Sequence, residues 1–289
     1  MRSSGSRIWI GISVILGLLL LGMAFTVSVF DLPNAEQTTL LGINAEGVIV
    51  GTYNDSGGVG HGFLLNKSGL ETIDFPGGYS TNVIGINSGG DLVGEYLDPN
   101  GNQHGFRRLV NHAIEAFDYP GSVTGFPRTI NNRGDIVGVF VDTSGNTHGY
   151  SFRTGTFTEI DYAGAVTTDT WGINDEREIV GDYVLSDGSQ HGFLLSEGSF
   201  RTIDVPNAVL TQPTRNSDSG TIIGDYQDKN AVTHGFVLRD GNLSTVDGPG
   251  SNFTRLRGIN SRGKVVGWFL DSNGLEHGLK AQPSHKDDD

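Results

Sequence analysis

Residues 42–74 read GINAEGVIVGTYNDSGGVGHGFLLNKSGLETID, and the pattern of this stretch returns throughout the chain. The dipeptide His-Gly near its centre occurs six times, at steps of 43 or 44 residues. An aspartate follows each of the first five dipeptides after thirteen or fourteen residues. A period of this length through almost all of a 289-residue chain predicts a single repeat architecture rather than several unrelated domains.

The repeated polar residues are histidines and aspartates in register. The histidines are His61, His104, His148, His191, His234 and His277. The aspartates are Asp74, Asp118, Asp161, Asp204 and Asp247, with Asp31 standing 43 residues ahead of Asp74. No aspartate follows His277 at the usual distance, and no His-Gly precedes Asp31. The repeat is therefore cut open, with its last piece at the front of the chain.

Each repeat contains four short stretches typical of β-strands. In the first copy they are residues 38–41, 48–53, 61–65 and 70–74. Turn formers such as Asp98-Pro99-Asn100-Gly101 separate the second stretch from the third. No window beyond the N-terminal segment has a helical apolar period. Four strands in a unit of about 43 residues predict an all-β fold, a six-bladed β-propeller with four strands per blade.

The N-terminal strand is expected to close the ring. Residues 27–35, VSVFDLPNA, match residues 200–208, FRTIDVPNA, which form the outer strand of another copy. We therefore expect the N-terminal strand to complete the last blade, which begins near Arg255. Such closure removes exposed sheet edges, which otherwise pair with other chains. The propeller is expected to span residues 25–281.

The two ends of the chain carry different signals. Arg2 and Arg7 precede an apolar run over residues 8–23, which predicts a secretory signal peptide at residues 1–24, with an uncleaved membrane anchor as the alternative. Either segment places the repeats outside the cytoplasmic membrane, in an extracellular or periplasmic location. Residues 282–289 are expected to form a disordered acidic tail.

Composition excludes several classes of function. The formal net charge is −14, which disfavours a nucleic-acid partner because such binding depends on clustered Lys and Arg. The chain has no cysteine, so it has no disulfide, thiol nucleophile or zinc–thiolate site. We expect a monomer with no cofactor and no membrane contact beyond the N-terminal segment.

The repeat resembles the bacterial extracellular repeat known as the HAF family. The resemblance rests on Gly-Ile-Asn, Gly-x-Tyr, His-Gly-Phe and Ile-Asp-x-Pro, over about residues 27–280. Four copies carry His-Gly-Phe, whereas Tyr150 and Leu279 replace the phenylalanine in two. The family's namesake motif has Ala where this chain has Gly in every copy. Membership implies an exported bacterial protein, and it implies no established activity or catalytic residue.

The residues common to all copies are expected to build the scaffold. We expect each histidine to hydrogen-bond its aspartate where strands meet turns, and we expect no metal at these pairs. The asparagine of each Gly-Ile-Asn anchor is expected to cap a tight turn after the first strand. In the fifth copy this anchor is replaced by Arg215-Asn216-Ser217.

Function is then expected where the copies differ. The strand leading to each anchor diverges most, three and five residues before the asparagine, and these strands are expected to line the central channel. The candidate ligand-binding residues are Arg128, Asp169, Trp171, Arg215, Arg255 and Arg257. Arginine suits bidentate binding of a carboxylate, and tryptophan offers a stacking face. The alternative is that they are solvated rim residues and salt bridges between blades.

Two classes of function remain. The first is a non-catalytic binding or scaffolding module for a glycan or protein at the cell surface. The second is an extracytoplasmic hydrolase or lyase acting on an anionic saccharide at the channel mouth. An enzyme needs an acid, base or nucleophile beside its binding groups. Because Asp169 is the only carboxylate expected at the mouth, binding is the preferred hypothesis and no catalytic residue is assigned.

Overall fold

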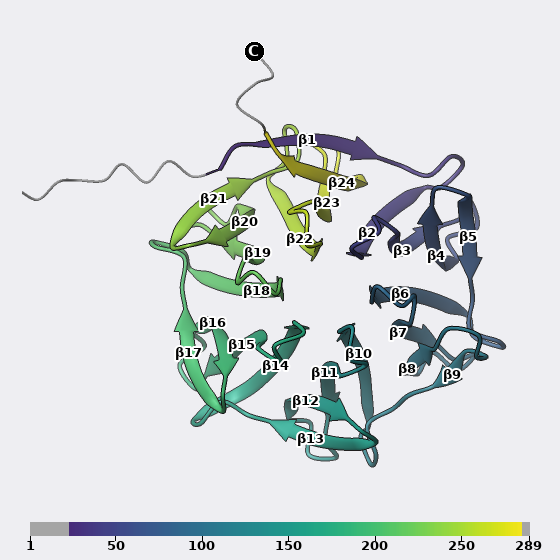
Figure 1. The fold of residues 1–289 in the computed structure, drawn as a ribbon, viewed down its shortest axis with the longest axis horizontal. Helices are drawn as coiled ribbons and strands as arrows, with labels where there is room; N and C mark the ends of the chain where they lie inside the picture. The colour runs from purple at the N-terminus through teal and green to yellow at the C-terminus, as the bar shows by residue number, and fades with distance from the viewer. Residues whose placement is uncertain (1–22, 285–289) are drawn as a thin grey trace, which may run out of the picture.

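The computed structural model describes residues 23–284, and every regular element in that range is a β-strand. The expected signal peptide or anchor lies almost wholly outside the described residues, as do the last five residues of the chain. Among the described residues there is no helix long and apolar enough to span a bilayer. Figure 1 shows the strands in radial groups around a central axis.

The strands fall into six units of four by their hydrogen bonding. Unit 1 comprises β2 (Gln37–Ile43), β3 (Ile49–Asn54), β4 (Gly60–Asn66) and β5 (Gly69–Ile73). Unit 2 comprises β6 (Ser80–Ile86), β7 (Leu92–Leu97), β8 (Gln103–Arg108) and β9 (Glu115–Ala116). Unit 3 comprises β10 (Thr124–Ile130), β11 (Ile136–Val141), β12 (Thr147–Arg153) and β13 (Thr156–Ile160).

The other three units repeat this order along the chain. Unit 4 comprises β14 (Ala165–Ile173), β15 (Ile179–Leu185), β16 (Gln190–Ser196) and β17 (Ser199–Ile203). Unit 5 comprises β18 (Leu210–Asn216), β19 (Ile222–Gln227), β20 (Thr233–Arg239) and β21 (Asn242–Val246). Unit 6 comprises β22 (Phe253–Ile259), β23 (Val265–Leu270), β24 (Glu276–Pro283) and, from the other end of the chain, β1 (Phe25–Phe30).

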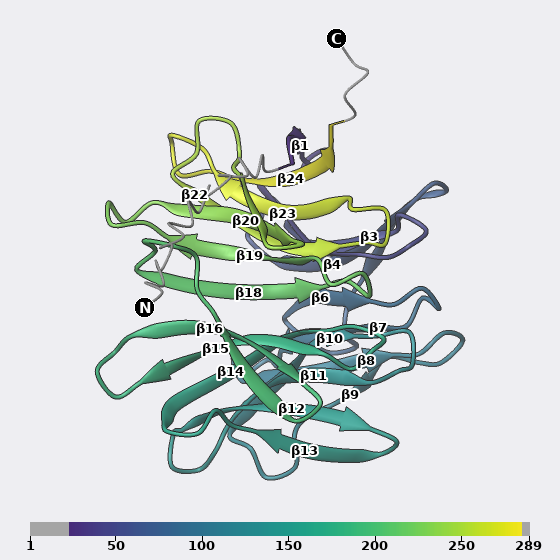
Figure 2. The same cartoon turned by 60° about the vertical axis from the view of Figure 1, so that its left-hand side comes forward.

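Within each unit, neighbouring strands pair antiparallel, as in β2-β3-β4-β5. Units 3 to 6 are also joined into one sixteen-stranded sheet. Each junction is a single parallel pair between the third strand of one unit and the first strand of the next, such as Thr147 with Thr167. In Figure 1 the first strands face the axis and the fourth strands lie outermost. Figure 2 shows the units stacked beside one another in an oblique view.

Strand β1 pairs with β24 along its whole length, from Phe25 opposite Pro283 to Phe30 opposite Gly278. The pairing of the N-terminal strand with the last repeat, expected from the sequence, is therefore present. Strand β24 continues to Pro283, so residues 282 and 283 belong to the sheet rather than to the expected tail.

The hydrophobic core lies between neighbouring units. In one cluster Val266 of unit 6 packs with Leu40, Ile43, Ile49 and Phe63 of unit 1, all of them buried. Glycine at position 51 is required because a β-carbon there would collide with the Thr39 carbonyl and press on the Phe63 ring. This packing explains why a glycine follows each anchor after seven residues.

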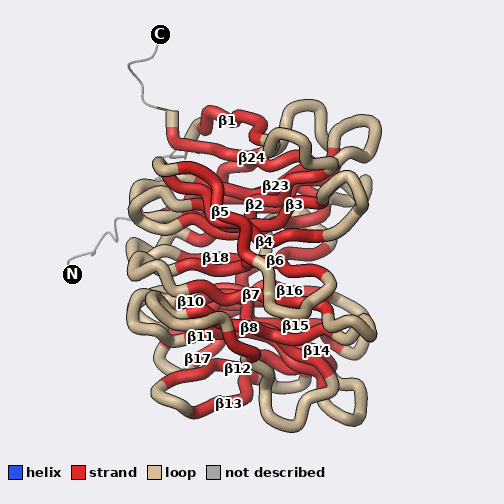
Figure 3. The backbone as a smooth tube through the Cα atoms, turned by 90° about the vertical axis from the view of Figure 1, so that its right-hand side faces the viewer, coloured by secondary structure: helices blue, strands red, loops and turns tan. Residues whose placement is uncertain are grey.

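The strands cross the disc from one face to the other, and the connecting loops gather on the two faces (Figure 3). Strand β9 is only two residues long, in the one copy that has an additional residue between its histidine and its aspartate.

Deleting residues 25–34 should destabilise the whole fold. The deletion removes β1 and leaves the backbone groups of β24 without their partners. We expect a melting temperature at least about 5 °C lower, with concentration-dependent aggregation, in a calorimetric comparison with the intact chain. An unchanged melting temperature would show that β1 contributes nothing to stability.

Candidate functional site

The strand ends nearest the axis form a ring of asparagine side chains, which we call the asparagine ring. The Nδ2 group of Asn44 donates to the Asn87 carbonyl at 3.2 Å, and Asn87 donates to the Asn131 carbonyl at 3.1 Å. The same bond links unit 3 to unit 4, unit 4 to unit 5, and unit 6 to unit 1. Each asparagine also accepts a backbone N–H four residues later, as in the turn at Asn44. The expected turn cap is present, and the bond to the next unit is an addition to it.

Unit 5 interrupts the asparagine ring. Ser217 occupies the anchor position, and its hydroxyl accepts the Thr221 N–H instead. Within the described part of the chain, no side chain donates to the Asn260 carbonyl. The neighbouring Asn216 replaces the usual isoleucine, and its buried Oδ1 atom has no partner. All three anchor residues of this unit therefore differ from the repeat.

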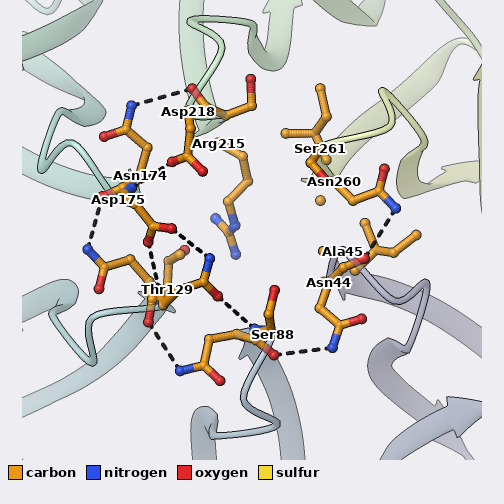
Figure 4. A pocket seen from close by; sticks show the side chains of 18 of the residues that line it. Asn44, Ala45, Ser88, Thr129, Asn174, Asp175, Arg215, Asp218, Asn260 and Ser261 are labelled. Carbon is orange, nitrogen blue, oxygen red and sulfur yellow. Dashed lines mark hydrogen bonds between the residues drawn. The ribbon is translucent and has the colours of Figure 1, made fainter.

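Arg215 stands where four other units have glycine, and its side chain points toward the centre of the ring (Figure 4). Its Nη1 group donates to the carbonyls of Trp171 and Thr214 at 2.8 and 2.7 Å. Its Nη2 group donates to the carbonyls of Arg128 and Ile84 at 3.0 and 3.4 Å. Arg215 thus joins units 2, 3, 4 and 5 at the centre of the ring.

The Arg215 guanidinium has no carboxylate partner among the described residues. Burial, followed by repulsion from Arg257 and Arg128, lowers its pKa to about 9. The side chain is therefore still charged at neutral pH, and its charge is balanced only by carbonyl dipoles. Because both Nη groups already donate to carbonyls, Arg215 would act on a ligand through its charge.

Above Arg215 lies a pocket of about 280 Å³ lined by the asparagine ring and the residues after it. Asp175 and Asp218 project from neighbouring units into this pocket (Figure 4). Asn132 donates its Nδ2 group to Asp175 at 2.7 Å, and the backbone N–H of Asp175 donates to Asp218 at 2.8 Å. The polar part of the lining is thus amide, hydroxyl and carboxylate with one cation at the floor, and the lining also includes the isoleucines of the five Ile-Asn anchors. We call this the asparagine-ring pocket.

Further along the same first strands, Arg128, Asp169, Trp171 and Arg257 come together as expected; with Arg255 we call them the arginine cluster. Arg128 Nη2 donates to Asp169 Oδ2 at 3.1 Å. The Arg128 guanidinium lies 3.6 Å from the centre of the Trp171 ring, and that of Arg257 lies 5.0 Å from it.

The arginine cluster is largely self-paired, which corrects the expected roles of two residues. Trp171 is 8% exposed, its face is covered by Arg128, and its Nε1 group donates to Asp182 at 2.8 Å. It therefore has no free face for a ligand. Arg257 is 4% exposed and donates to Asp225 at 2.6 Å. Arg255, 3.8 Å from Asp225, has the most exposed side chain of the cluster at 34%.

Asp182 and Asp225 are site residues that the sequence analysis missed. They lie on the second strands, directly opposite Asp169 and Gln212. The expectation that Asp169 is the only carboxylate here was therefore wrong. The signal was the residue between the glycine and the aromatic residue of each copy. That residue differs in most units: Thr52, Glu95, Val139, Asp182, Asp225 and Trp268.

Asp182 has an unusual environment for a carboxylate. Burial and the nearby Asp169 charge raise its pKa to about 7, although hydrogen bonds from Gln212, Trp171 and Gln190 act to lower it. Burial likewise raises the pKa of Asp169, although Arg128 opposes the shift. Three buried polar atoms of the cluster have no hydrogen-bond partner: Arg128 Nε, Asp169 Oδ1 and Arg255 Nε. Such atoms usually bind water or a ligand.

All six histidines contact the aspartates expected for them. The Nδ1–carboxylate distances lie between 2.8 and 3.1 Å in the six units, and the last pair is His277 with Asp31. In every unit except unit 4 a second aspartate, six residues earlier, lies within 3.9 Å of Nε2.

No protein-family model and no curated protein sequence matches the chain. Solved structures that it resembles include a TolB-like protein from Agrobacterium tumefaciens, with a TM-score of 0.59, 13% identity, and coverage of 91% of this chain and 99% of that one. The propeller domain of the trilobed protease from Pyrococcus furiosus gives 0.52 and 8%, with coverage of 89% and 98%. The six-bladed Aleuria aurantia lectin, which recognises fucose, gives 0.51 and 8%, with coverage of 85% and 93%. At these identities the likeness shows the fold alone: the chain is a β-propeller.

Replacing Asp182 with asparagine should change how stability depends on pH. In the folded protein Asp182 keeps its proton up to about pH 7, whereas in the unfolded chain it ionises near 3.8. The unfolded state therefore loses its proton first, and wild-type stability falls as the pH rises between these values. Asparagine does not ionise, so Asp182→Asn should avoid this loss, which we expect to be about 1–3 kcal/mol in the free energy of unfolding. Its melting temperature relative to wild type should therefore rise by several degrees from pH 4.5 to 7.5.

The control for this measurement is Asp240→Asn, because the Asp240 side chain is 80% exposed. Its melting curve should follow wild type at every pH. Parallel pH profiles for wild type and Asp182→Asn would contradict the raised pKa.

Proposed function

We propose that the six units are the blades of a closed six-bladed propeller of HAF-type repeats. Four observations support this: the four-stranded pairing in each unit, the β1–β24 pairing, the repeated packing between units, and the bond from Asn260 to the Asn44 carbonyl. We also propose that the protein is exported, with residues 1–24 as signal peptide or anchor, and that it acts as a monomer outside the cytoplasmic membrane.

We propose that the protein is a non-catalytic glycan-binding module whose ligand enters the asparagine-ring pocket. The observation that carries this proposal is the set of polar groups in the pocket lining: amides, hydroxyls and two carboxylates around the Arg215 floor, beside the isoleucines of the anchors. Sugar hydroxyls donate and accept hydrogen bonds, and this lining offers both kinds of partner. The volume of about 280 Å³ lies near the lower end of small-molecule sites and suits one sugar residue.

The charges in the asparagine-ring pocket favour a neutral sugar over an acidic one. Asp175 and Asp218 bring two negative charges to the rim, against one positive charge from Arg215. The arginine cluster offers little to an anion, because Arg128 and Arg257 already pair with aspartates. A protein ligand is the other form of the binding hypothesis.

The alternative function is a hydrolase or lyase acting at the arginine cluster. Asp182 favours it, since a carboxylic acid with a pKa near 7 can donate a proton at neutral pH. Binding is preferred because Asp182 is 4% exposed and both its oxygens already accept hydrogen bonds.

Arg215→Gly tests the glycan proposal, because it restores the residue of four other units and removes the pocket floor. On a glycan array, wild type should retain a set of neutral glycans, and the variant should bind them at least about tenfold more weakly. Arg201→Ala is the matched control, since it removes an exposed arginine from an outer strand. Equal binding by wild type and Arg215→Gly, or no binding by either, would refute the proposal.

Product analysis separates the two functions. Incubation with polysaccharides should release no shortened product from wild type. Release that is lost in both Asp182→Asn and Asp169→Asn would establish the enzyme instead.

A further inference from the structure

One histidine–aspartate pair differs from the other five. In unit 3, His148 Nδ1 lies 2.9 Å from Asp161 Oδ2 and 3.9 Å from Glu159 Oε1. The ligand atoms of these three side chains all lie within 4.8 Å of one another. Within residues 23–284, no other group of three histidine, cysteine or acidic side chains is this close. Around the histidine Nδ1 atom, unit 3 therefore has three metal-ligating side chains, whereas each of the other units has two.

The third ligand arises from a paired change in unit 3. Units 1, 4 and 5 have threonine at the position of Glu159, and its hydroxyl lies 2.9 to 3.3 Å from a tyrosine hydroxyl. These pairs are Tyr53–Thr72, Tyr183–Thr202 and Tyr226–Thr245. In unit 3 Phe140 replaces the tyrosine, so Glu159 has no hydroxyl partner and its carboxylate lies beside His148.

The surroundings of His148 favour a bound cation. Asp142 Oδ2 lies 3.5 Å from His148 Nε2, so carboxylates face both ring nitrogens of His148. A proton or a metal ion must lie between His148 Nδ1 and the two acidic side chains that face it. A carboxylate on the far nitrogen also orients histidine ligands in metal sites.

Partial burial lowers the pKa of His148, but the hydrogen bond and charge of Asp161, with the charge of Glu159, outweigh it and raise the pKa overall. Burial and the nearby Asp161 raise the pKa of Glu159.

We propose that His148, Glu159 and Asp161 bind one divalent transition-metal ion of the Zn²⁺ class. One imidazole and two carboxylates form a ligand set suited to such ions. Bonds of about 2.0–2.2 Å place neighbouring ligand atoms roughly 3.3–3.6 Å apart in tetrahedral geometry, between the two distances found here. The side chains are 19%, 51% and 41% exposed, so the remaining coordination positions are open to water. The proposal is independent of the glycan-binding function.

Calorimetric titration of the full chain with Zn²⁺ tests the proposal. Wild type should bind one Zn²⁺ ion. The variant Glu159→Thr, which has the residue found in units 1, 4 and 5, should bind that ion at least about tenfold more weakly. Glu176→Gln is the matched control, because it removes an exposed carboxylate from a turn of unit 4. His285 and the C-terminal aspartates are common to all three proteins, so any binding there cancels in the comparison.

Two further readouts identify the site and check the fold. The ring protons of His148 should shift on Zn²⁺ addition in wild type alone, and Zn²⁺ should raise the melting temperature of wild type more than that of Glu159→Thr. If Glu159→Thr does not fold, Glu159→Gln takes its place. Equal Zn²⁺ affinity in wild type and variant, no Zn²⁺ binding, or equal shifts of all six repeat histidines would overturn the proposal.

Discussion

The amide-to-carbonyl bond between successive anchor asparagines is the constraint on which the structure depends. Each unit buries its hydrophobic residues against its neighbours, so every interface must hold the same spacing. A side-chain amide donating to the backbone of the next unit sets that spacing at the axis, where the strands are closest. The glycine two residues before the anchor lets the backbones approach, since a β-carbon at Gly42 would press on the Ile84 carbonyl.

Two units, 5 and 3, depart from the residues that the other copies share. Unit 5 has none of the three anchor residues, and its Arg215 instead donates hydrogen bonds to backbone carbonyls of four units. Unit 3 has Phe140 and Glu159 in place of the tyrosine–threonine pair, and the Glu159 carboxylate lies beside His148. Both departures place polar or charged groups where the repeat would leave glycine or hydroxyl. Positions common to the copies thus form the scaffold, and the exceptions are the places where we propose that ligands bind.

Much of the fold could be predicted from the period of the sequence. The histidine–aspartate contacts and the pairing of β1 with β24 follow from register alone, because strands of equal spacing repeat equal contacts. The candidate site was predicted only in part. Arg128, Asp169 and Trp171 do lie in contact. These candidates were chosen from the first strands alone, so Asp182 and Asp225, which lie on the facing second strands, were missed. Whether an arginine is free or paired depends on that second strand.

The most direct test restores the repeat in unit 5 with Arg215→Gly, Asn216→Ile and Ser217→Asn together. The new asparagine would donate to the Asn260 carbonyl and the isoleucine would fill the core, while the pocket floor disappears. We expect the free energy of unfolding of this variant to be about 1–3 kcal/mol higher than that of wild type, with a correspondingly higher melting temperature. We also expect it to lose the glycans that wild type retains. A restored chain that melts lower, or that binds glycans as wild type does, would contradict this account.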